Sequence, residues 1–334
     1  MSKTVSLDTL RGVATAALVA ANTSDENARI VAEALVAADA DGLSSHGVSR
    51  IPFYADQSAS GKVDGHAVPE LRVVAQACVR VDARDGFAFP AMRAGLDAAT
   101  ELLGHAGTAA VAISNSHHAG AGGYHVEHVA RQGYLALGFS NTPSGMAPWG
   151  GFKGTFGTNP IFFACPRENN PPLVIDLSLS KVARGKVMLA EKSGEAIPPD
   201  WALDAQGQPT ADPKAALAGT MVPIGEAKGA ALALMVEILA AGLTGSHFAF
   251  QASSFFTANG PPPRIGQFFV LFNPAVCAGD GFASRIEELI AEILSQDGAR
   301  LPGDRRLAQR EKSLRKGVVL PDQLYDELVR RAGQ

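Results

Sequence analysis

Apolar residues recur at helical spacing in several segments of the chain. One apolar face runs through residues 6–20, and a second helix is predicted to begin after the capping cluster Thr23-Ser24-Asp25 and to end near Asp41. The same periodicity predicts further helices at about 91–104, 124–132, 181–194, 226–243, 281–296 and 321–331. Segment 226–243 is the most apolar of them, so we expect it to be central and buried.

Short apolar runs bounded by turn residues predict strands between these helices. The runs lie at 79–83, 108–114, 134–141, 162–165, 173–178 and 266–273. Residues 142–160 contain too much glycine and proline for regular structure, which predicts a long functional loop, and 197–225 is predicted to be mostly loop. Because strands and helices alternate, the pattern indicates an α/β or α+β protein with about two intertwined lobes.

The composition is that of a globular protein that is not built to coat a polyanion. A length of 334 residues allows about two domains at roughly 150 residues each. Hydrophobic residues make up 46% and charged residues 19%, which excludes a disordered chain. With 29 basic and 33 acidic residues the net charge is −4, too close to neutral for a protein that covers nucleic acid or an anionic membrane.

Neither a signal peptide nor a membrane span is predicted. The N-terminal segment is apolar along one helical face only and is interrupted by Asp8 and Arg11, and no run reaches 18 uncharged apolar residues. Cys78, Cys165 and Cys277 are odd in number and widely spaced, which indicates a reducing compartment. We therefore expect a cytoplasmic protein with no membrane or nucleic-acid partner.

A glycine-rich turn follows the predicted strand 108–114. Gly120-Ala121-Gly122-Gly123 approaches the dinucleotide fingerprint, but His125 stands where its third glycine belongs, so a Rossmann domain is not supported. The turn still allows backbone N–H groups to approach a pyrophosphate, and a tight strand-to-helix turn explains it equally well.

A serine and a histidine are adjacent in a predicted loop, where they could form an acid–base pair. Ser45 and His46 need a carboxylate to orient the imidazole, and Asp176, at the end of an apolar strand, is the best candidate. Arg50 suits bidentate binding of a substrate carboxylate, although a surface salt bridge is the commoner role of an arginine.

Histidines cluster in the region of the glycine-rich turn. His117, His118, His125 and His128 could bind zinc together with Asp176 or Glu127. Neighbouring histidines point apart, however, and no HExxH pattern supports them, so we expect no metal. One of the first pair facing a pocket is favoured, with solvated helix positions for the last two.

Three further segments suit phosphate groups. Thr158 precedes a strand, Lys228 stands at the start of a predicted helix, and Gly303-Asp304-Arg305-Arg306 offers two guanidinium groups. Each alone is explained structurally, but together they fit a polyanionic cofactor spread over several loops. Basic groups available for a 2′-phosphate, which favours NADPH, are Lys181, Arg184, Lys186, Arg305 and Arg306.

An ordered set of motifs resembles the malate/L-lactate dehydrogenase superfamily with the non-Rossmann, L-sulfolactate-dehydrogenase-like fold. The motifs are DGLSSHGVSRIPFY, ISNSHHAGAGG, FGTNPIFFACP, VIDLS, PIGEAKGAALALMVEILAAGLTG and PGDRR, over about residues 5–331. Within that superfamily, SHHAGAG, HFAFQ and GDRRLAQREK look most like Δ1-piperideine-2-carboxylate/Δ1-pyrroline-2-carboxylate reductases.

The resemblance implies a mainly antiparallel central sheet that binds the cofactor, with a helical flanking domain, in a homodimer whose active site lies near the subunit interface. It places the sheet domain at 71–274 and packs the N-terminal helical segment 1–70 with 275–334. By motif, Ser45, His46 and Asp176 match a charge-relay group, and Arg50 and His118 are expected to bind substrate. The expected cofactor-binding residues are His118, Ala119, Gly120, Ala121, Gly122, Thr158, Lys228, Gly303, Asp304, Arg305, Arg306 and Arg310.

The function predicted from the sequence is NADPH-dependent reduction of a cyclic imino acid to L-pipecolate or L-proline. In this reading His46 supplies the proton to the ring nitrogen. One alternative is an NAD(P)-dependent 2-hydroxy-acid dehydrogenase in which His118 takes the hydroxyl proton. The other is a zinc-dependent hydrolase that uses the histidine cluster.

Overall fold

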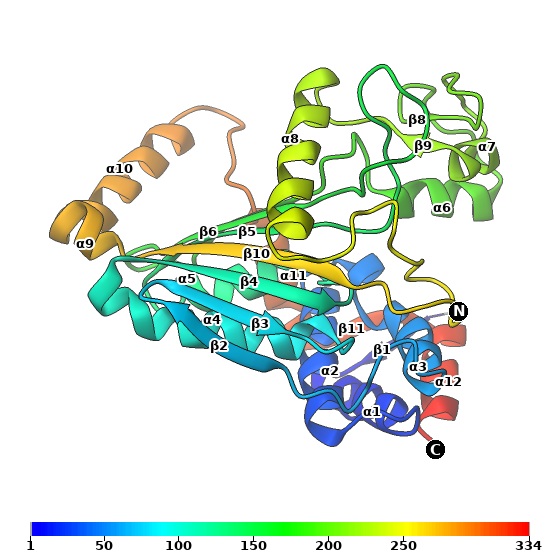
Figure 1. The fold of residues 1–334 in the computed structure, drawn as a ribbon, viewed down its shortest axis with the longest axis horizontal. Helices are drawn as coiled ribbons and strands as arrows, with labels where there is room; N and C mark the ends of the chain where they lie inside the picture. Colours follow the sequence, from blue (N-terminus) through cyan, green and yellow to red (C-terminus); the bar gives the residue numbers. More distant parts are fainter. Residues whose placement is uncertain (1, 334) are drawn as a thin grey trace.

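A seven-stranded sheet forms the centre of the molecule in the computed structural model, which describes residues 2–333 (Figure 1). Its strand order is β2-β3-β4-β10-β5-β6-β7. Within this sheet β3 and β4 run parallel and the other neighbouring pairs are antiparallel, which confirms the predicted mainly antiparallel sheet. The strands are β2 (Glu70–Ala75), β3 (Cys78–Asp82), β4 (Thr108–Ser116), β10 (Ile265–Phe272), β5 (Leu135–Ser140), β6 (Ile161–Cys165) and β7 (Leu173–Leu177).

The central strand β10 explains why both faces of this sheet are covered. Phe269 and Leu271 are fully buried on one face, while Phe268 and Val270 alternate onto the other. Helices α4 (Ala88–Ala106) and α5 (Gly122–Ala130) cover one face, and α8 (Ala227–Glu237) with the π-helix η3 (Ile238–Gly242) lies over the other (Figure 1). The sheet is therefore the middle layer of three, with helices on both of its faces.

A helical unit closes the N-terminal side. Helices α1 (Leu7–Val19) and α2 (Asp25–Ala40) begin at the side-chain caps Ser6 and Ser24, and α3 (Ile51–Ala59) follows two single 3₁₀ turns, η1 (Ser44–His46) and η2 (Val48–Arg50). Strand β1 (Ser2–Val5) pairs with β11 (Val318–Pro321), and α1 contacts α12 (Asp322–Arg331). The last segment of the chain is thereby fixed to the first.

Two segments project from this frame. Helices α9 (Pro274–Ala278) and α10 (Phe282–Leu294), with the turn η4 (Gly279–Gly281), extend from the end of the sheet away from the helical unit (Figure 1). Helices α6 (Arg184–Ser193) and α7 (Pro213–Ala218), with strands β8 (Ala202–Leu203) and β9 (Thr220–Met221), form a small lobe beside α8. The division into residues 1–70 with 275–334 and 71–274 stays a prediction.

Several elements were not predicted from the sequence, among them α9. Strand β2 is exposed throughout and strands β1 and β11 are exposed in part, while α11 (Asp304–Lys316) is dominated by charged side chains. Segment 197–225 contains β8, α7 and β9 rather than loop alone. No helix within residues 2–333 combines the length and apolar character that crossing a bilayer requires.

The predicted burial of segment 226–243 is wrong. Gly229, Ala233 and Val236 of α8 are buried, but Leu234 of α8 and Ile238 of η3 are 47% and 56% exposed. The helix is apolar on both sides, so its composition alone did not show that the chain covers only one of them.

Candidate active site

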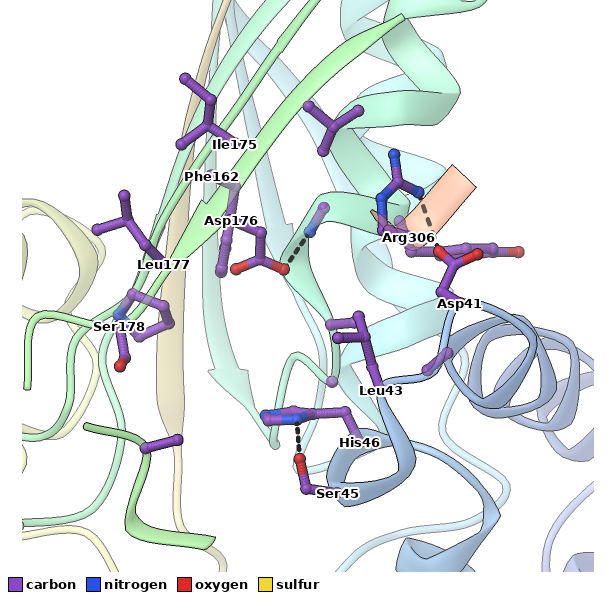
Figure 2. A pocket seen from close by; sticks show the side chains of 18 of the residues that line it. Asp41, Leu43, Ser45, His46, Phe162, Ile175, Asp176, Leu177, Ser178 and Arg306 are labelled. Atoms are coloured by element: carbon purple, nitrogen blue, oxygen red, sulfur yellow. Dashed lines mark hydrogen bonds and ion pairs between the residues drawn. The ribbon is translucent and has the colours of Figure 1, made fainter. Parts of the chain in front are cut away.

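A cavity of about 1070 Å³ opens between the sheet, the helical unit and α11. This volume is slightly above the range of roughly 300–1,000 Å³ for small-molecule sites. Figure 2 shows the end of β7 and the following Ser178 on one wall, with Leu43, Ser45 and His46 on the wall opposite. The remaining wall contains the turn before α5 and the start of α11.

A buried carboxyl group shapes the loop that carries Ser45 and His46. Asp39, near the end of α2, accepts the N–H of Val48 at 2.7 Å, and burial raises its pKa to about 7 although this hydrogen bond opposes the shift. A Cβ at Gly47 would lie 2.2 Å from that carboxyl group, so only glycine fits there. The turn between η1 and η2 is thus tied to α2.

His46 is paired with the adjacent serine. Its Nδ1 lies 2.9 Å from Ser45 Oγ, and the ring lines the cavity (Figure 2). Burial, helped by the nearby positive charge of Arg50, lowers the pKa of His46 to about 4, so the imidazole is neutral at pH 7. Arg50 donates from Nε to Ser45 O at 2.7 Å and its guanidinium lies over Phe256, which supports the loop from behind.

His118 stacks beside His46. The two ring centroids are 5.6 Å apart, and His118 Nδ1 lies 2.6 Å from the buried hydroxyl group of Tyr54. Burial raises the pKa of Tyr54 well above its ordinary value, so the phenol stays protonated, and burial also lowers the pKa of His118 well below its ordinary value. Two neutral imidazoles therefore face the same part of the cavity.

Asp176 occupies the opposite wall. Its Oδ2 accepts the N–H of Gly123 at 2.8 Å, at the start of α5. Although the side chain is exposed to the cavity, the surrounding protein raises its pKa to about 6. Although Asp176 and His46 line one cavity, no hydrogen bond joins them within residues 2–333. The contact that the predicted charge relay requires is not formed, and Ser45 is the group that orients the imidazole.

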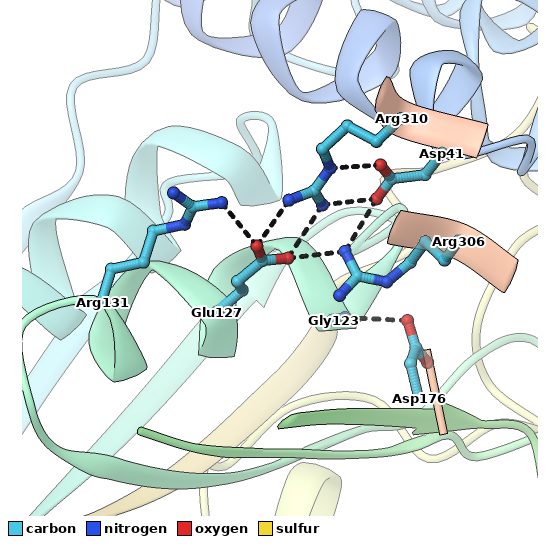
Figure 3. A network of polar contacts seen from close by, with 7 residues as sticks. All are labelled: Asp41, Gly123, Glu127, Arg131, Asp176, Arg306 and Arg310. Carbon is cyan, nitrogen blue, oxygen red and sulfur yellow. Dashed lines mark hydrogen bonds and ion pairs between the residues drawn. The ribbon is translucent and has the colours of Figure 1, made fainter. Parts of the chain in front are cut away.

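A buried ionic network holds α11 to the cavity (Figure 3). Arg310 bridges Asp41 and Glu127 with contacts of 2.6 to 2.9 Å, and Arg306 contacts the same two carboxylates at 2.9 and 2.6 Å. Arg131 adds a further contact to Glu127 at 2.7 Å. Burial alone would raise the pKa of Glu127, but the guanidinium groups outweigh it and lower this pKa to about 2.

Most of the expected cofactor-binding residues come together around the cavity. His118, Ala119, Gly120, Ala121, Thr158, Gly303, Arg305 and Arg306 line it, together with Lys181 and Lys186. Arg306 Nη2 is buried without a hydrogen-bond partner among the described residues, which leaves one donor available. Clustered cations and an unpaired donor fit a ligand with several phosphate groups.

Five residues that were predicted to bind the cofactor or the substrate do not line the cavity. Arg310 is consumed by the ionic network, and Asp304 accepts the N–H of Leu301 instead of facing the cavity. A Cβ at Gly122 would lie 1.9 Å from the Phe162 ring, so this glycine serves packing. Lys228 in α8 and Arg50 behind Ser45 are also outside the described cavity lining.

The histidines of the glycine-rich turn have other partners. His117 Nε2 lies 3.0 Å from Gln57 Oε1, and His128 Nε2 lies 2.8 Å from Asp97. His125 is buried with Nε2 3.1 Å from Ala119 O, so the solvated position predicted for it is wrong. Within residues 2–333 no group of three or more potential ligands could hold a metal ion.

Sequence reasoning did not identify Tyr54 or Gln309 as site residues. Tyr54 is 64 positions from its partner His118, and Gln309, one helical turn after Arg305, lines the cavity. The spacing of Arg305 and Gln309 at i and i+4 would have indicated a shared face, had α11 been predicted as a helix.

Known proteins with a similar sequence or structure agree with this fold. The family described as malate/L-lactate dehydrogenase matches residues 5–329. The chain belongs to this family. It is 54% identical to a protein of Chromohalobacter salexigens named (2R)-3-sulfolactate dehydrogenase (NADP(+)), over 98% of this chain and 98% of that one.

Two solved structures of the malate/L-lactate dehydrogenase family illustrate its range. The Δ1-piperideine-2-carboxylate reductase of Pseudomonas syringae pvar. tomato has a TM-score of 0.94 at 40% identity, covering 98% of this chain and 99% of that one. The sulfolactate dehydrogenase of Methanocaldococcus jannaschii has a TM-score of 0.90 at 27% identity, covering 99% and 97%. The predicted family and fold are thus confirmed, and the chain is an oxidoreductase.

Proposed function

We propose that this protein is an NADP-dependent dehydrogenase that interconverts (2R)-3-sulfolactate and 3-sulfopyruvate. The observation that carries the proposal is the 54% identity with the named sulfolactate dehydrogenase, which extends over 98% of both chains. The cationic lining of the cavity supports it, because a substrate with a carboxylate and a sulfonate brings two negative charges.

The reduction of a cyclic imino acid, expected from the motifs, is the second candidate. It is favoured by the 40% identity and close structural match with the piperideine reductase. Two of the three motifs behind that expectation, SHHAGAG and GDRRLAQREK, form the turn before α5 and the start of α11, and the third, HFAFQ, follows η3. The first two are the longer ones. These segments line the part of the cavity that we assign to the cofactor, so they carry little information about the substrate.

NADPH fits the cavity between α11, β7 and the turn before α5. Arg305 and the unpaired Nη2 of Arg306 would hold its phosphate groups, and Thr158 and the turn at 119–121 would line its remaining surface. The cofactor supplies the hydride that reduces C2 of the substrate.

His46 is the group that we expect to carry the proton. When Nδ1 is protonated it donates to Ser45 Oγ, and Nε2 is left with a lone pair that accepts the hydroxyl proton during oxidation. During reduction the same nitrogen returns that proton to the substrate oxygen. His118, stacked on His46 and held by Tyr54, is placed to bind the same part of the substrate.

We further propose that the protein is a homodimer. The exposed apolar side chains of α8 and η3 continue to Leu243, Phe248 and Phe250, which are 59%, 37% and 60% exposed. A contiguous apolar surface of this kind is typical of a subunit interface. The cytoplasmic location stays a prediction.

Comparison of substrates in one direction tests the proposed reaction. With NADPH we expect kcat/KM for 3-sulfopyruvate to exceed that for Δ1-piperideine-2-carboxylate and Δ1-pyrroline-2-carboxylate by at least about tenfold. The reverse order would establish the imine reductase instead. Exhaustive chelation should leave the rate unchanged, whereas loss of activity with loss of stoichiometric zinc would contradict the mechanism.

A further inference from the structure

We propose that Lys186 binds the sulfonate of the substrate and thereby sets a preference for doubly charged over singly charged 2-oxo acids. The inference rests on the proposed function and assigns a specificity-determining residue to it. It also separates Lys186 from the basic groups that were expected to bind a 2′-phosphate.

The first turn of α6 lies beside the loop that carries Ser45 and His46. A Cβ built at Gly185 would lie 3.7 Å from Ser45 Cβ, so the backbone next to Lys186 passes close to the residue that orients His46. Lys186 itself lines the cavity, as do Lys181, Val182 and Ala183 before it. The chain therefore places a lysine in the cavity wall on the side of His46.

The charge of Lys186 is free for a ligand. Within residues 2–333 no carboxylate lies within ion-pair distance of it, and its recorded contact is with the Trp201 ring, 6.0 Å from the centroid. The neighbouring cations differ in this respect. Lys181 is paired with Asp200, and Arg184 donates to Leu217 O.

The arginines of α11 are not positioned for this role. Arg306 is bound to Asp41 at the upper right of Figure 2, whereas Ser45 and His46 lie at the bottom. Gly303, which precedes α11, is close to Val174 O at the beginning of β7. The cavity thus has cations at both ends, and we assign those of α11 to the cofactor and Lys186 to the substrate.

A sulfonate stays ionised over the whole physiological pH range, so its attraction to an ammonium group persists wherever the lysine is protonated. Pyruvate has the same 2-oxo acid group without the sulfonate. Removal of the Lys186 charge should therefore weaken one substrate selectively, because the carboxylate and carbonyl contacts are common to both.

Lys186→Gln tests this assignment. We expect the variant to raise KM for 3-sulfopyruvate tenfold to a hundredfold, to change KM for pyruvate less than threefold, and to leave KM for NADPH unchanged. Lys186→Arg, which keeps the charge, should restore most of the loss. Lys192→Gln, on the same helix but outside the described cavity lining, is the matched control and should behave as wild type.

The outcomes separate the two proposals. The role of Lys186 would be overturned if Lys186→Gln raised KM equally for 3-sulfopyruvate and pyruvate, raised KM for NADPH alone, or changed no KM at all. The proposed function would stand in each of these cases. A wild-type protein that does not reduce 3-sulfopyruvate would overturn the proposed function and this inference together.

Discussion

At the scale of single residues, the protein environment keeps the imidazoles of His46 and His118 neutral. His118 is buried and His46 is half-buried in the cavity wall, and both lie near the positive charge of Arg50. Desolvation and this charge both disfavour a second positive charge. Their partners, Ser45 and Tyr54, are neutral hydroxyl groups. The free protein therefore presents a base for oxidation instead of an imidazolium.

The pH dependence of oxidation follows from this state. The base is active when unprotonated and is lost as pH falls through the pKa of about 4. We expect kcat/KM for (2R)-3-sulfolactate to be flat from pH 7 to about 5 and to fall below that, since kcat/KM reports groups of the free enzyme. An acid limb near pH 6 that disappears in Asp176→Asn would contradict this and transfer the role to Asp176, whose pKa is raised to about 6.

Arg305 tests the assignment of the cofactor end of the cavity. It lines the cavity in the first turn of α11 and is exposed there. A charged hydrogen bond contributes roughly 1.5–3 kcal/mol, so Arg305→Ala should raise KM for NADPH about 10- to 100-fold. KM for NADH should change little if the lost partner is the 2′-phosphate. Equal changes for both cofactors would place Arg305 elsewhere on the nucleotide.

The ionic network belongs to the scale of elements, because it joins α2, α5 and α11. Asp41 directly follows α2, beside the loop that carries Ser45 and His46. Glu127 belongs to α5, and Arg306 and Arg310 belong to α11. Such a network stabilises these elements only while both signs of charge are present, since an unpaired buried charge is costly.

The contribution of Glu127 to the free energy of unfolding should depend on pH. The pKa of Glu127 falls from an ordinary 4.5 to about 2 on folding, so its contribution is complete above pH 4.5 and is lost as pH falls through 2. We expect Glu127→Gln to lower the free energy of unfolding by about 3 kcal/mol at pH 7.

Denaturant unfolding of the wild type and of Glu127→Gln between pH 7 and 2 measures this free energy. The difference in the free energy of unfolding between the two proteins should shrink between pH 4.5 and 2. Glu33→Gln, which removes surface pairs with Arg29 and Arg93, is the control and should cost less than about 1 kcal/mol. A Glu127→Gln difference of the same small size would show that the network contributes nothing.

Elements with a regular apolar pattern could be predicted from the sequence, and elements stabilised by distant partners could not. Strands β4 and β10 have continuous apolar runs that are buried against both helical layers. Helix α11 is held by carboxylates more than 170 residues away, so its own residues gave no apolar stripe. The same limit explains the site, where Ser45 and His46 are adjacent in sequence but Tyr54 and His118 meet only in the fold.

At the scale of the whole molecule, the apolar face of α8 and η3 is the largest departure from the expected burial. Leu234 and Ile238 belong to the most apolar helix of the sequence but are half exposed in the single chain. A homodimer that buries this face reconciles the composition of the helix with its position.

Substitutions on this face test the dimer. Leu234→Glu combined with Ile238→Glu should convert a dimer to a monomer in sedimentation or light-scattering measurements, because each buried leucine or isoleucine contributes roughly 1.5–3 kcal/mol. Leu314→Glu, on an equally exposed apolar residue of α11, should leave the dimer intact. A monomeric wild-type protein, or a dimer that survives both changes, would contradict the proposed interface.

Turnover by a His46 variant tests most directly whether the cavity is the active site and His46 carries the proton. We expect His46→Ala to lower kcat by about 10² to 10⁴, the range for a positioned acid or base, while the Kd for NADPH measured by fluorescence titration stays within about threefold. Near-normal turnover in His46→Ala, with activity abolished in His118→Ala, would contradict this account and assign the proton to His118.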